Sequence, residues 1–413
     1  MAPRLPLEVL ERIIDDIVPD PLCEYGLYNS LKPVKACALV CHSFLPLCRK
    51  IIFAFVALNE PGRSDNFDRL LSNSPHLAMY IRKLNYRVEE GEFGPERSPW
   101  LSSMFKKLVK LQKLRISYIP PYWGKLDWMA LSGRMVLLPL LHLPTLTSIC
   151  LETIFNFPLA DLAGCVNLKQ LEVQYLDFSN GVGKFLEVLP PTQVMLERLR
   201  TIVDQRGFET VQRLCDARRP DGKPIIDFSS LREITAEVEL LDSMKDFFGM
   251  CRNLHKIDLF SMSLPYYFFI HFILLLLIVD YYSESTSSLK GLFAMLKPSL
   301  PTLVTIVIKY CIDDDENGPL GGLCHELEKM AGQNMVETIE LVIWVPLSCD
   351  CTRWGELDDV LMGSPGGWPA LRKVSLSFQG GDDSVNEALR ELPMTKLVES
   401  KQVQFDFDIN KLY

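Results

Sequence analysis

The sequence lacks the patterns that mark most catalytic and metal-binding proteins. It has only 6 histidines among 413 residues, and they fall singly and far apart. No Gly-x-Ser-x-Gly nucleophile motif and no complete dinucleotide-binding glycine fingerprint occurs. The 12 cysteines are spread without the paired spacings of a zinc site. We therefore expect that the protein is not an enzyme and holds no metal or cofactor.

Long basic runs are also missing, and the formal net charge is −9. This balance argues against nucleic acid as a partner. No Asn-x-Ser/Thr glycosylation site is present, and the first residues become charged too early for a secretion signal. Together these features predict free thiols in a reducing compartment, either cytoplasmic or nuclear.

A short apolar pattern does recur: an apolar residue, two of any type, a second apolar residue, one of any type, and a third. Clear copies begin at Leu146, Leu168, Leu231, Leu254, Leu303, Val336 and Leu371, and looser ones at Ile81 and Leu111. The pattern is typical of leucine-rich repeats, in which short strands direct alternate side chains into a shared core. Stacked repeats form a solenoid that usually binds another macromolecule.

The copies are unevenly spaced along the chain. Leu171 and Ile234 lie 63 residues apart, which predicts a degenerate repeat between them at Leu196-Leu199-Ile202. Several return segments have helical spacing: 67–71, 208–215, 244–250 and 320–330. Near the end, residues 403–409 alternate apolar and polar, which predicts a half-buried strand that closes the array.

One apolar segment interrupts the array. Residues 259–279 contain no Asp, Glu, Lys or Arg, and length alone would allow a membrane span. A span here would separate the last repeats from the others, so we favour an apolar insertion over about 259–285. A translated intron, a buried helix native to the repeat, and a membrane span remain the alternatives.

The first 60 residues have helical patterns. Leu7, Leu10, Ile14 and Ile17 share one face of a helix over 5–17, and a second helix is predicted over 34–48, with Pro46 bending or ending it. The block resembles an F-box in its Leu-Pro-Leu-Glu-Val-Leu opening at 5–10 and its Ala-Cys-Ala-Leu-Val-Cys-His-Ser-Phe segment at 36–44. With irregular repeats behind it, the arrangement is similar to the large F-box families of mushroom-forming fungi.

The resemblance implies small helices that bind the adaptor of an SCF-type ubiquitin ligase, and through it a cullin. Residues expected to bind the adaptor are Leu5, Pro6, Leu10, Ile14, Val34, Leu39, Val40 and Phe44. The alternative is that these helices only cap the open end of the repeat core.

Large aromatic residues are candidates for contact with a target protein, because they bury much area at low entropic cost. They are Trp123, Trp128, Trp344 and Trp354. Trp354, in a polar context, is expected to be the most exposed. The alternative for each is a place in the core.

The sequence thus predicts an α/β protein: an all-α F-box-like domain over 1–60, then an irregular leucine-rich-repeat solenoid with a parallel sheet over 64–413. The expected function is target recognition for an SCF-type ubiquitin ligase, with an unknown protein target and no membrane or nucleic-acid partner. A scaffold or sensor that binds proteins through the repeats, without any ligase, is the alternative.

Overall fold

The fold was obtained as a computed structural model. It describes residues 31–40, 44–60, 62–88, 98–119, 124–131, 133–179, 192–202, 208–237, 244–260, 289–311, 322–345, 354–363, 367–380, 383–392 and 394–410, with Val9 and His42 besides. The chain divides into two compact units. The first contains residues 1–168 and 176–194, and the second contains 169–175 and 195–413.

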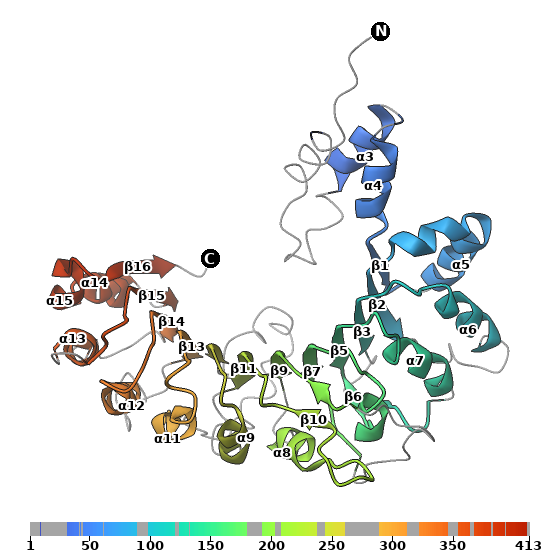
Figure 1. Cartoon of the computed structure of the whole chain (residues 1–413). Coiled ribbons are helices and arrows are strands. Elements are labelled where there is room, and N and C mark those ends of the chain that lie inside the picture. Colours follow the sequence, from blue (N-terminus) through green and yellow to red (C-terminus); the bar gives the residue numbers. More distant parts are fainter. Residues whose placement is uncertain are drawn as a thin grey trace, which may run out of the picture. The chain divides into compact units, whose positions relative to one another are not determined.

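The protein is a mixed α/β protein with a large parallel sheet (Figure 1). The sheet has 12 strands in an open order that follows the sequence. They are β1 (Phe55–Leu58), β2 (Lys83–Val88), β3 (Lys113–Tyr118), β5 (Ser148–Glu152), β7 (Gln170–Gln174), β9 (Arg198–Ile202), β11 (Glu233–Glu237), β12 (Lys256–Phe260), β13 (Thr305–Cys311), β14 (Thr338–Val345), β15 (Lys373–Gly380) and β16 (Gln404–Asn410).

Helices form most of the segments that return from one strand to the next. In the first unit they are α3 (Lys32–Val40), α4 (Leu45–Ile52), α5 (Arg63–Asn73), η1 (Pro75–Tyr80), α6 (Ser98–Lys106), α7 (Arg134–Leu141) and η2 (Leu159–Leu162). In the second they are α8 (Phe208–Asp216), α9 (Lys245–Met250), α11 (Leu292–Leu296), α12 (Leu323–Met330), α13 (Gly355–Met362), α14 (Asp383–Arg390) and α15 (Thr395–Glu399). Short pairs of strands lie outside the main sheet: β4 (Leu126–Asp127) with β6 (Ile154–Phe155), and β8 (Val194–Met195) with β10 (Ile226–Asp227).

The apolar triplets line the core, as predicted. Their side chains are at most 6% exposed in every copy, because alternate residues of each strand face the helices. The register keeps equivalent positions side by side: Ile257 pairs with Ile306, Ile306 with Ile339, and Ile339 with Val374. In Figure 1, α8, α9, α11, α12 and α13 lie on the same side of the strands of the second unit. The opposite face of those strands has no helix over it among the described elements.

One hydrogen-bond arrangement recurs where a repeat enters its strand. Two successive backbone N–H groups donate to a single carbonyl of the preceding repeat, at 2.7–3.1 Å. The accepting carbonyls are those of Ala54, Arg82 and Gln112 in the first unit and of Lys169, Glu197, Arg232, His255, Val304 and Glu337 in the second. The repeats are therefore equivalent in their backbone contacts as well as in their apolar residues.

The degenerate repeat between Leu171 and Ile234 is present as β9. Leu196 and Leu199 are buried as predicted, but the third inward position is Thr201, which is fully buried, while Ile202 is half-exposed. Position 202 was therefore the wrong choice, because alternation from Leu199 directs 201, and not 202, to the core.

The four predicted return helices are confirmed in α5, α8, α9 and α12, and the strand predicted over 403–409 is confirmed as β16. The single helix predicted over 34–48 is wrong. The chain forms α3 and α4 instead, because Pro46 lies in the first turn of α4, where its missing N–H is not needed.

The limits of the predicted N-terminal domain also differ from the observed fold. Strand β1 lies inside the predicted helical block of 1–60 and pairs with β2 in parallel. The helix predicted over 5–17 lies outside the described residues apart from Val9, as does the apolar insertion after Phe260. Leu259 and Phe260 themselves belong to β12.

Buried carboxylates join neighbouring helices of the second unit. Glu326 of α12 accepts the backbone N–H of Phe293 in α11 at 2.9 Å and the Lys329 ammonium at 2.8 Å. Burial alone would raise the pKa of Glu326, but hydrogen bonds from Lys329 and from the backbone of Phe293 and Gly291 lower it below its ordinary value. The carboxylate therefore stays charged and holds the start of α11 in place.

Asp358 of α13 does the same for α15. Its two oxygens accept the backbone N–H groups of Lys396 and Leu397, each at 2.8 Å, and the residue is 2% exposed. We expect Asp358→Ala to lower the free energy of unfolding by about 2 kcal/mol, because two N–H groups at a helix start lose their acceptor. Urea denaturation followed by circular dichroism measures this change.

The adjacent residue supplies the control. The Asp359 side chain is 70% exposed and pairs with Lys396 at 2.7 Å on the surface. Asp359→Ala should leave the urea midpoint almost unchanged. Equal losses in the two variants would contradict a capping role for Asp358.

Candidate protein-binding surfaces

The first candidate surface lies on α3. Val34 and Cys48 are fully buried between α3 and α4, and several partly buried side chains pack around them. These are Leu31, Cys37, Ala38, Phe44, Leu47, Ile51 and Ile52. Because Val34, Cys37 and Ala38 recur at helical spacing, they form the inner stripe of α3.

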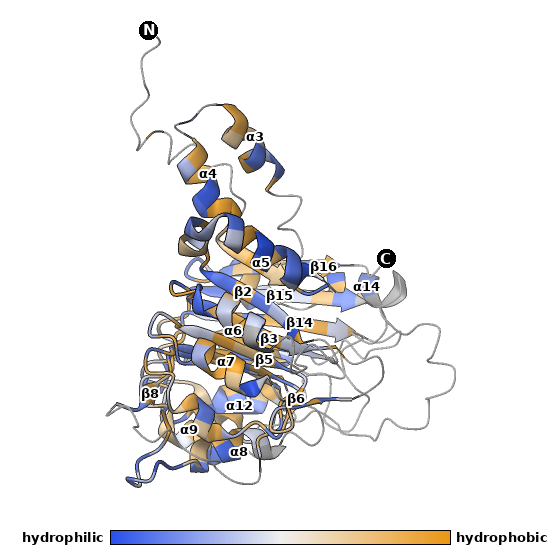
Figure 2. Ribbon diagram, turned by 90° about the vertical axis from the view of Figure 1, so that its right-hand side faces the viewer, coloured by the Kyte–Doolittle hydropathy of each residue, from blue (hydrophilic) through white to orange (hydrophobic). Residues whose placement is uncertain are grey.

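Leu39 and Val40 fall outside that stripe. Leu39 is 88% exposed and Val40 is 72% exposed, so two neighbouring aliphatic side chains face solvent at the end of α3. Figure 2 shows hydrophobic positions along both α3 and α4. Two adjacent apolar side chains of this exposure are a feature of protein-binding surfaces, since nothing in the helix pair requires them.

The predicted adaptor-binding residues thus separate into three groups. Leu5, Pro6, Leu10 and Ile14 lie outside the described residues. Leu39 and Val40 are accessible, whereas Phe44 is partly buried in the α3–α4 cluster just before α4. Val34 is wrong as a contact residue, because its side chain is completely buried and can only hold the two helices together.

The predicted target-binding tryptophans also differ in how far they are buried. Trp123 lies outside the described residues, and Trp344 is half-exposed on β14. Trp128 is completely buried: its ring lies 5.0 Å from that of Phe157, and its indole N–H donates to Asp161 Oδ2 at 2.8 Å. Trp128 is therefore a core residue, which corrects its assignment as a target contact.

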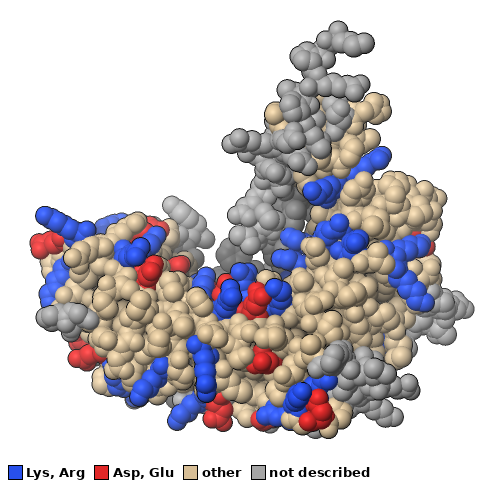
Figure 3. Space-filling view, viewed as in Figure 1, with Lys and Arg blue, Asp and Glu red and all other residues tan. Residues whose placement is uncertain are grey.

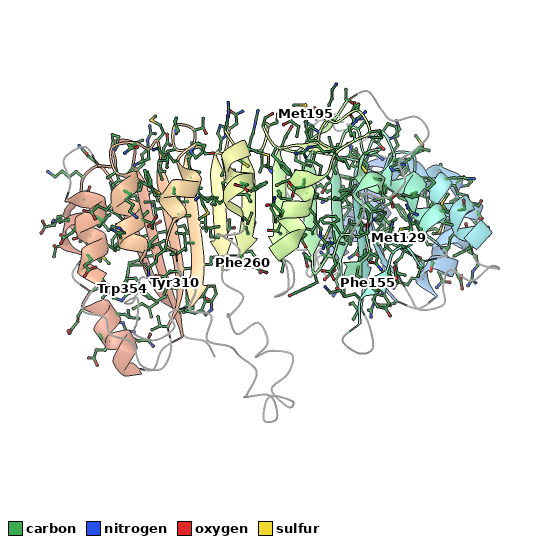
Figure 4. The ribbon with its side chains drawn as sticks, turned by 90° about the horizontal axis from the view of Figure 1, so that it is seen from below. Met129, Phe155, Met195, Phe260, Tyr310 and Trp354 are labelled. Atoms are coloured by element: carbon green, nitrogen blue, oxygen red, sulfur yellow. The ribbon has the colours of Figure 1, made fainter. Side chains whose placement is uncertain are left out.

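The prediction that Trp354 is the most exposed tryptophan is wrong. Trp354, labelled in Figure 4, has no exposed surface and packs edge-to-face on Phe378, with ring centroids 4.9 Å apart. The ring centroid of Phe378 in turn lies 5.8 Å from that of Phe407 in β16. The polar neighbours of Trp354 suggested exposure, but Trp354 is the N-cap residue of α13 and its ring is buried in the core.

A buried charge centre in the first unit was not foreseen from the sequence. Arg134 donates to both carboxylate oxygens of Asp161, at 2.7 and 3.0 Å, and His142 Nε2 lies 2.8 Å from the Asp161 carbonyl oxygen. The hydrogen bond to Asp161 raises the pKa of Arg134. Burial, together with the nearby Asp161 charge, raises the pKa of the Cys165 thiol. A protonated thiol and a fully paired carboxylate make this centre structural rather than reactive.

The second candidate surface is the open face of the sheet in the second unit, formed by the residues that alternate with the buried ones. Ion pairs cross it between neighbouring strands, and Figure 3 shows acidic and basic side chains together over β7, β9 and β11. The pairs are Arg200–Glu172 at 3.3 Å, Arg198–Glu233 at 3.0 Å, Lys309–Asp258 at 3.2 Å and Lys373–Asp406 at 2.7 Å.

Aromatic side chains join the charges toward β14. Phe260, labelled in Figure 4, ends β12 beside Lys309 in the register, and Trp344 lies on β14 beside Cys311 and Gln379. Both side chains are half-exposed. Phe260 was missed as a candidate because the apolar run that follows it hides the strand alternation. Mixed ion pairs and half-exposed aromatics suit a protein partner better than a small molecule.

Comparisons with known proteins add no relative. No family model matches the chain, and no curated protein sequence matches it. Within the described residues, no group of three or more His, Cys, Asp or Glu side chains could hold a metal ion. In the same part of the chain, no helix combines the length and the apolar character that crossing a bilayer requires.

Proposed function

We propose that this chain is the target-recognition subunit of an SCF-type ubiquitin ligase. An F-box-like N-terminal segment would bind the adaptor, and a leucine-rich-repeat-like array would bind the target. The exposure of Leu39 and Val40 carries the proposal, because a segment that only capped the repeats would turn such side chains inward. The open face of the sheet in the second unit supports the second half of the proposal.

The mechanism needs no catalytic group on this chain. Ubiquitin transfer between separate molecules loses translational and rotational entropy, and a subunit that holds both participants removes much of that cost. Binding the adaptor at one unit and the target at the other raises the effective concentration of the target near the charged conjugating enzyme.

The test uses an exposed pair of substitutions. The double variant Leu39→Asp/Val40→Asp should abolish co-purification of the SCF adaptor with the full chain, because charges replace the apolar contact. Thermal unfolding should change little, since both side chains already face solvent and two aspartates in the last turn of α3 oppose the helix dipole only weakly. Size-exclusion chromatography of the purified pair of proteins measures the complex directly.

Ile119 offers a matched control. It is 56% exposed in the same unit, and Ile119→Asp should leave adaptor binding intact. If the intact chain fails to bind the adaptor at micromolar concentrations, the ligase is excluded and the protein-binding scaffold remains. Loss of binding in the Ile119 variant as well would place the contact elsewhere.

A further inference from the structure

Strand β16 is the last strand of the sheet, and it combines three features of a peptide-binding edge. The first is an edge of backbone groups beside which the described residues place no further strand. In a parallel sheet, the N–H and C=O groups of one residue point to the same neighbouring strand, and those of the next residue point to the opposite side. Because the Gln404 N–H donates to the Arg372 carbonyl at 2.7 Å, the even-numbered residues of β16 face β15. The backbone groups of Phe405, Phe407 and Ile409 therefore face away from β15.

The second feature is an incompletely covered apolar row. Phe405, Phe407 and Ile409 align with Val374, Leu376 and Phe378 of β15. The β15 residues are at most 1% exposed, whereas Phe407 is 38% exposed and the other two are half-buried. One more strand would extend the core over this row.

The third feature is an excess of negative charge on the other face of β16. Asp406 is paired with Lys373, but Asp408 accepts a hydrogen bond only from Asn410, at 2.7 Å, and meets no cation among the described residues. Lys373 lowers the pKa of Asp406 through a hydrogen bond, so the Asp406 carboxylate is charged at neutral pH. In Figure 3, acidic side chains are visible at this end of the second unit.

We propose that β16 binds an extended peptide in which basic residues alternate with apolar ones. Its backbone would pair with the free edge, its apolar residues would cover Phe405, Phe407 and Ile409, and its basic residues would lie beside Asp406 and Asp408. A second copy of the chain fits less well, because self-pairing would bring these aspartates beside one another. The peptide would form part of the target in the proposed function, although the binding itself needs no ligase.

The probe is a fluorescein-labelled peptide as long as β16, 7 residues, that alternates valine with lysine. Fluorescence anisotropy with the full chain should show saturable binding that weakens with salt. Three comparison peptides should bind at least about tenfold more weakly. One carries glutamate in place of lysine, one groups the same valines and lysines in two blocks, and one has N-methylated backbone amides.

Two variants of the protein distinguish binding at the β16 edge from non-specific attraction of the peptide to an acidic surface. Asp408→Lys should weaken binding of the valine–lysine peptide about tenfold. Glu328→Lys makes the same charge change on α12, where the Glu328 side chain is 69% exposed, and should leave binding nearly unchanged. Both sites are exposed, so both variants should fold.

Three outcomes would overturn the proposal: no binding of the valine–lysine peptide at about 1 mM, equal binding of the block or N-methylated peptides, or equal effects of the two variants. A dimer of the intact chain that becomes tighter in Asp408→Lys would point to self-pairing instead and also reject the peptide, because the substitution relieves the repulsion between the paired aspartates. The Leu39→Asp/Val40→Asp variant keeps β16 intact, so failure of peptide binding and failure of adaptor binding are measured separately.

Discussion

Trp354→Ala should lower the free energy of unfolding by about 3–5 kcal/mol, the range for removal of a large buried aromatic ring. The indole is fully buried and supports Phe378, which in turn contacts Phe407 at the end of the sheet. Removing it leaves a cavity beneath the last strands, because close-packed neighbours relax only partly. Urea denaturation with circular dichroism measures the loss.

Trp344→Ala is the matched control for this experiment. Both tryptophans lie in the second unit, but Trp344 is half-exposed on the open face of β14. Its removal should cost about 1 kcal/mol or less. If Trp344→Ala proved the more destabilising variant, the core position of Trp354 would be wrong.

Asp161→Ala should destabilise the first unit by about 3 kcal/mol. The Asp161 carboxylate accepts hydrogen bonds from Arg134 and from the Trp128 indole, and only 4% of the residue is exposed. Without it, a partly buried cation and a fully buried indole N–H lose their acceptor. Thermal unfolding monitored by tryptophan fluorescence is suited to this test, because Trp128 itself reports on the site.

Asp177 supplies the comparison, since it pairs with Lys125 at 2.9 Å but is 37% exposed. Asp177→Ala should cost about 1 kcal/mol or less and should become neutral in high salt. The Asp161 variant should keep its defect in high salt. A defect of Asp161→Ala that salt removes would show that the pair is solvated.

The proposed binding functions use different parts of the chain. Leu39 and Val40 lie in the first unit, whereas the open sheet face and β16 lie in the second. Each can therefore be altered by surface substitutions that leave the triplet core untouched. This separation is what a subunit that binds an adaptor and a target requires.

Sequence reasoning was accurate where the pattern is periodic and local. The triplets predicted the strands and their buried residues, and alternation over 403–409 predicted β16. The same reasoning failed at Pro46, which suits a helix start as well as a helix end. It failed again at Ile202, which was chosen because it is apolar. Strand alternation places Thr201, and not Ile202, in the core.

The positions of single side chains were much harder to predict. Trp344 and Trp354 have the same side chain, yet one faces solvent and the other fills the core. Asp358 and Asp359 are adjacent, yet one caps a helix that begins at Thr395 and the other pairs on the surface. Such differences depend on partners that are distant in sequence, which no local pattern contains.

The sequence by itself determined the large parallel sheet, because a short strand with alternate apolar residues can bury them only beside similar strands. Tertiary structure alone decided how far each tryptophan is buried, how Asp161 pairs with Arg134, and that β16 is the last strand of the sheet among the described residues. These features depend on contacts between segments many residues apart, and contacts of that kind exist only once the chain has folded.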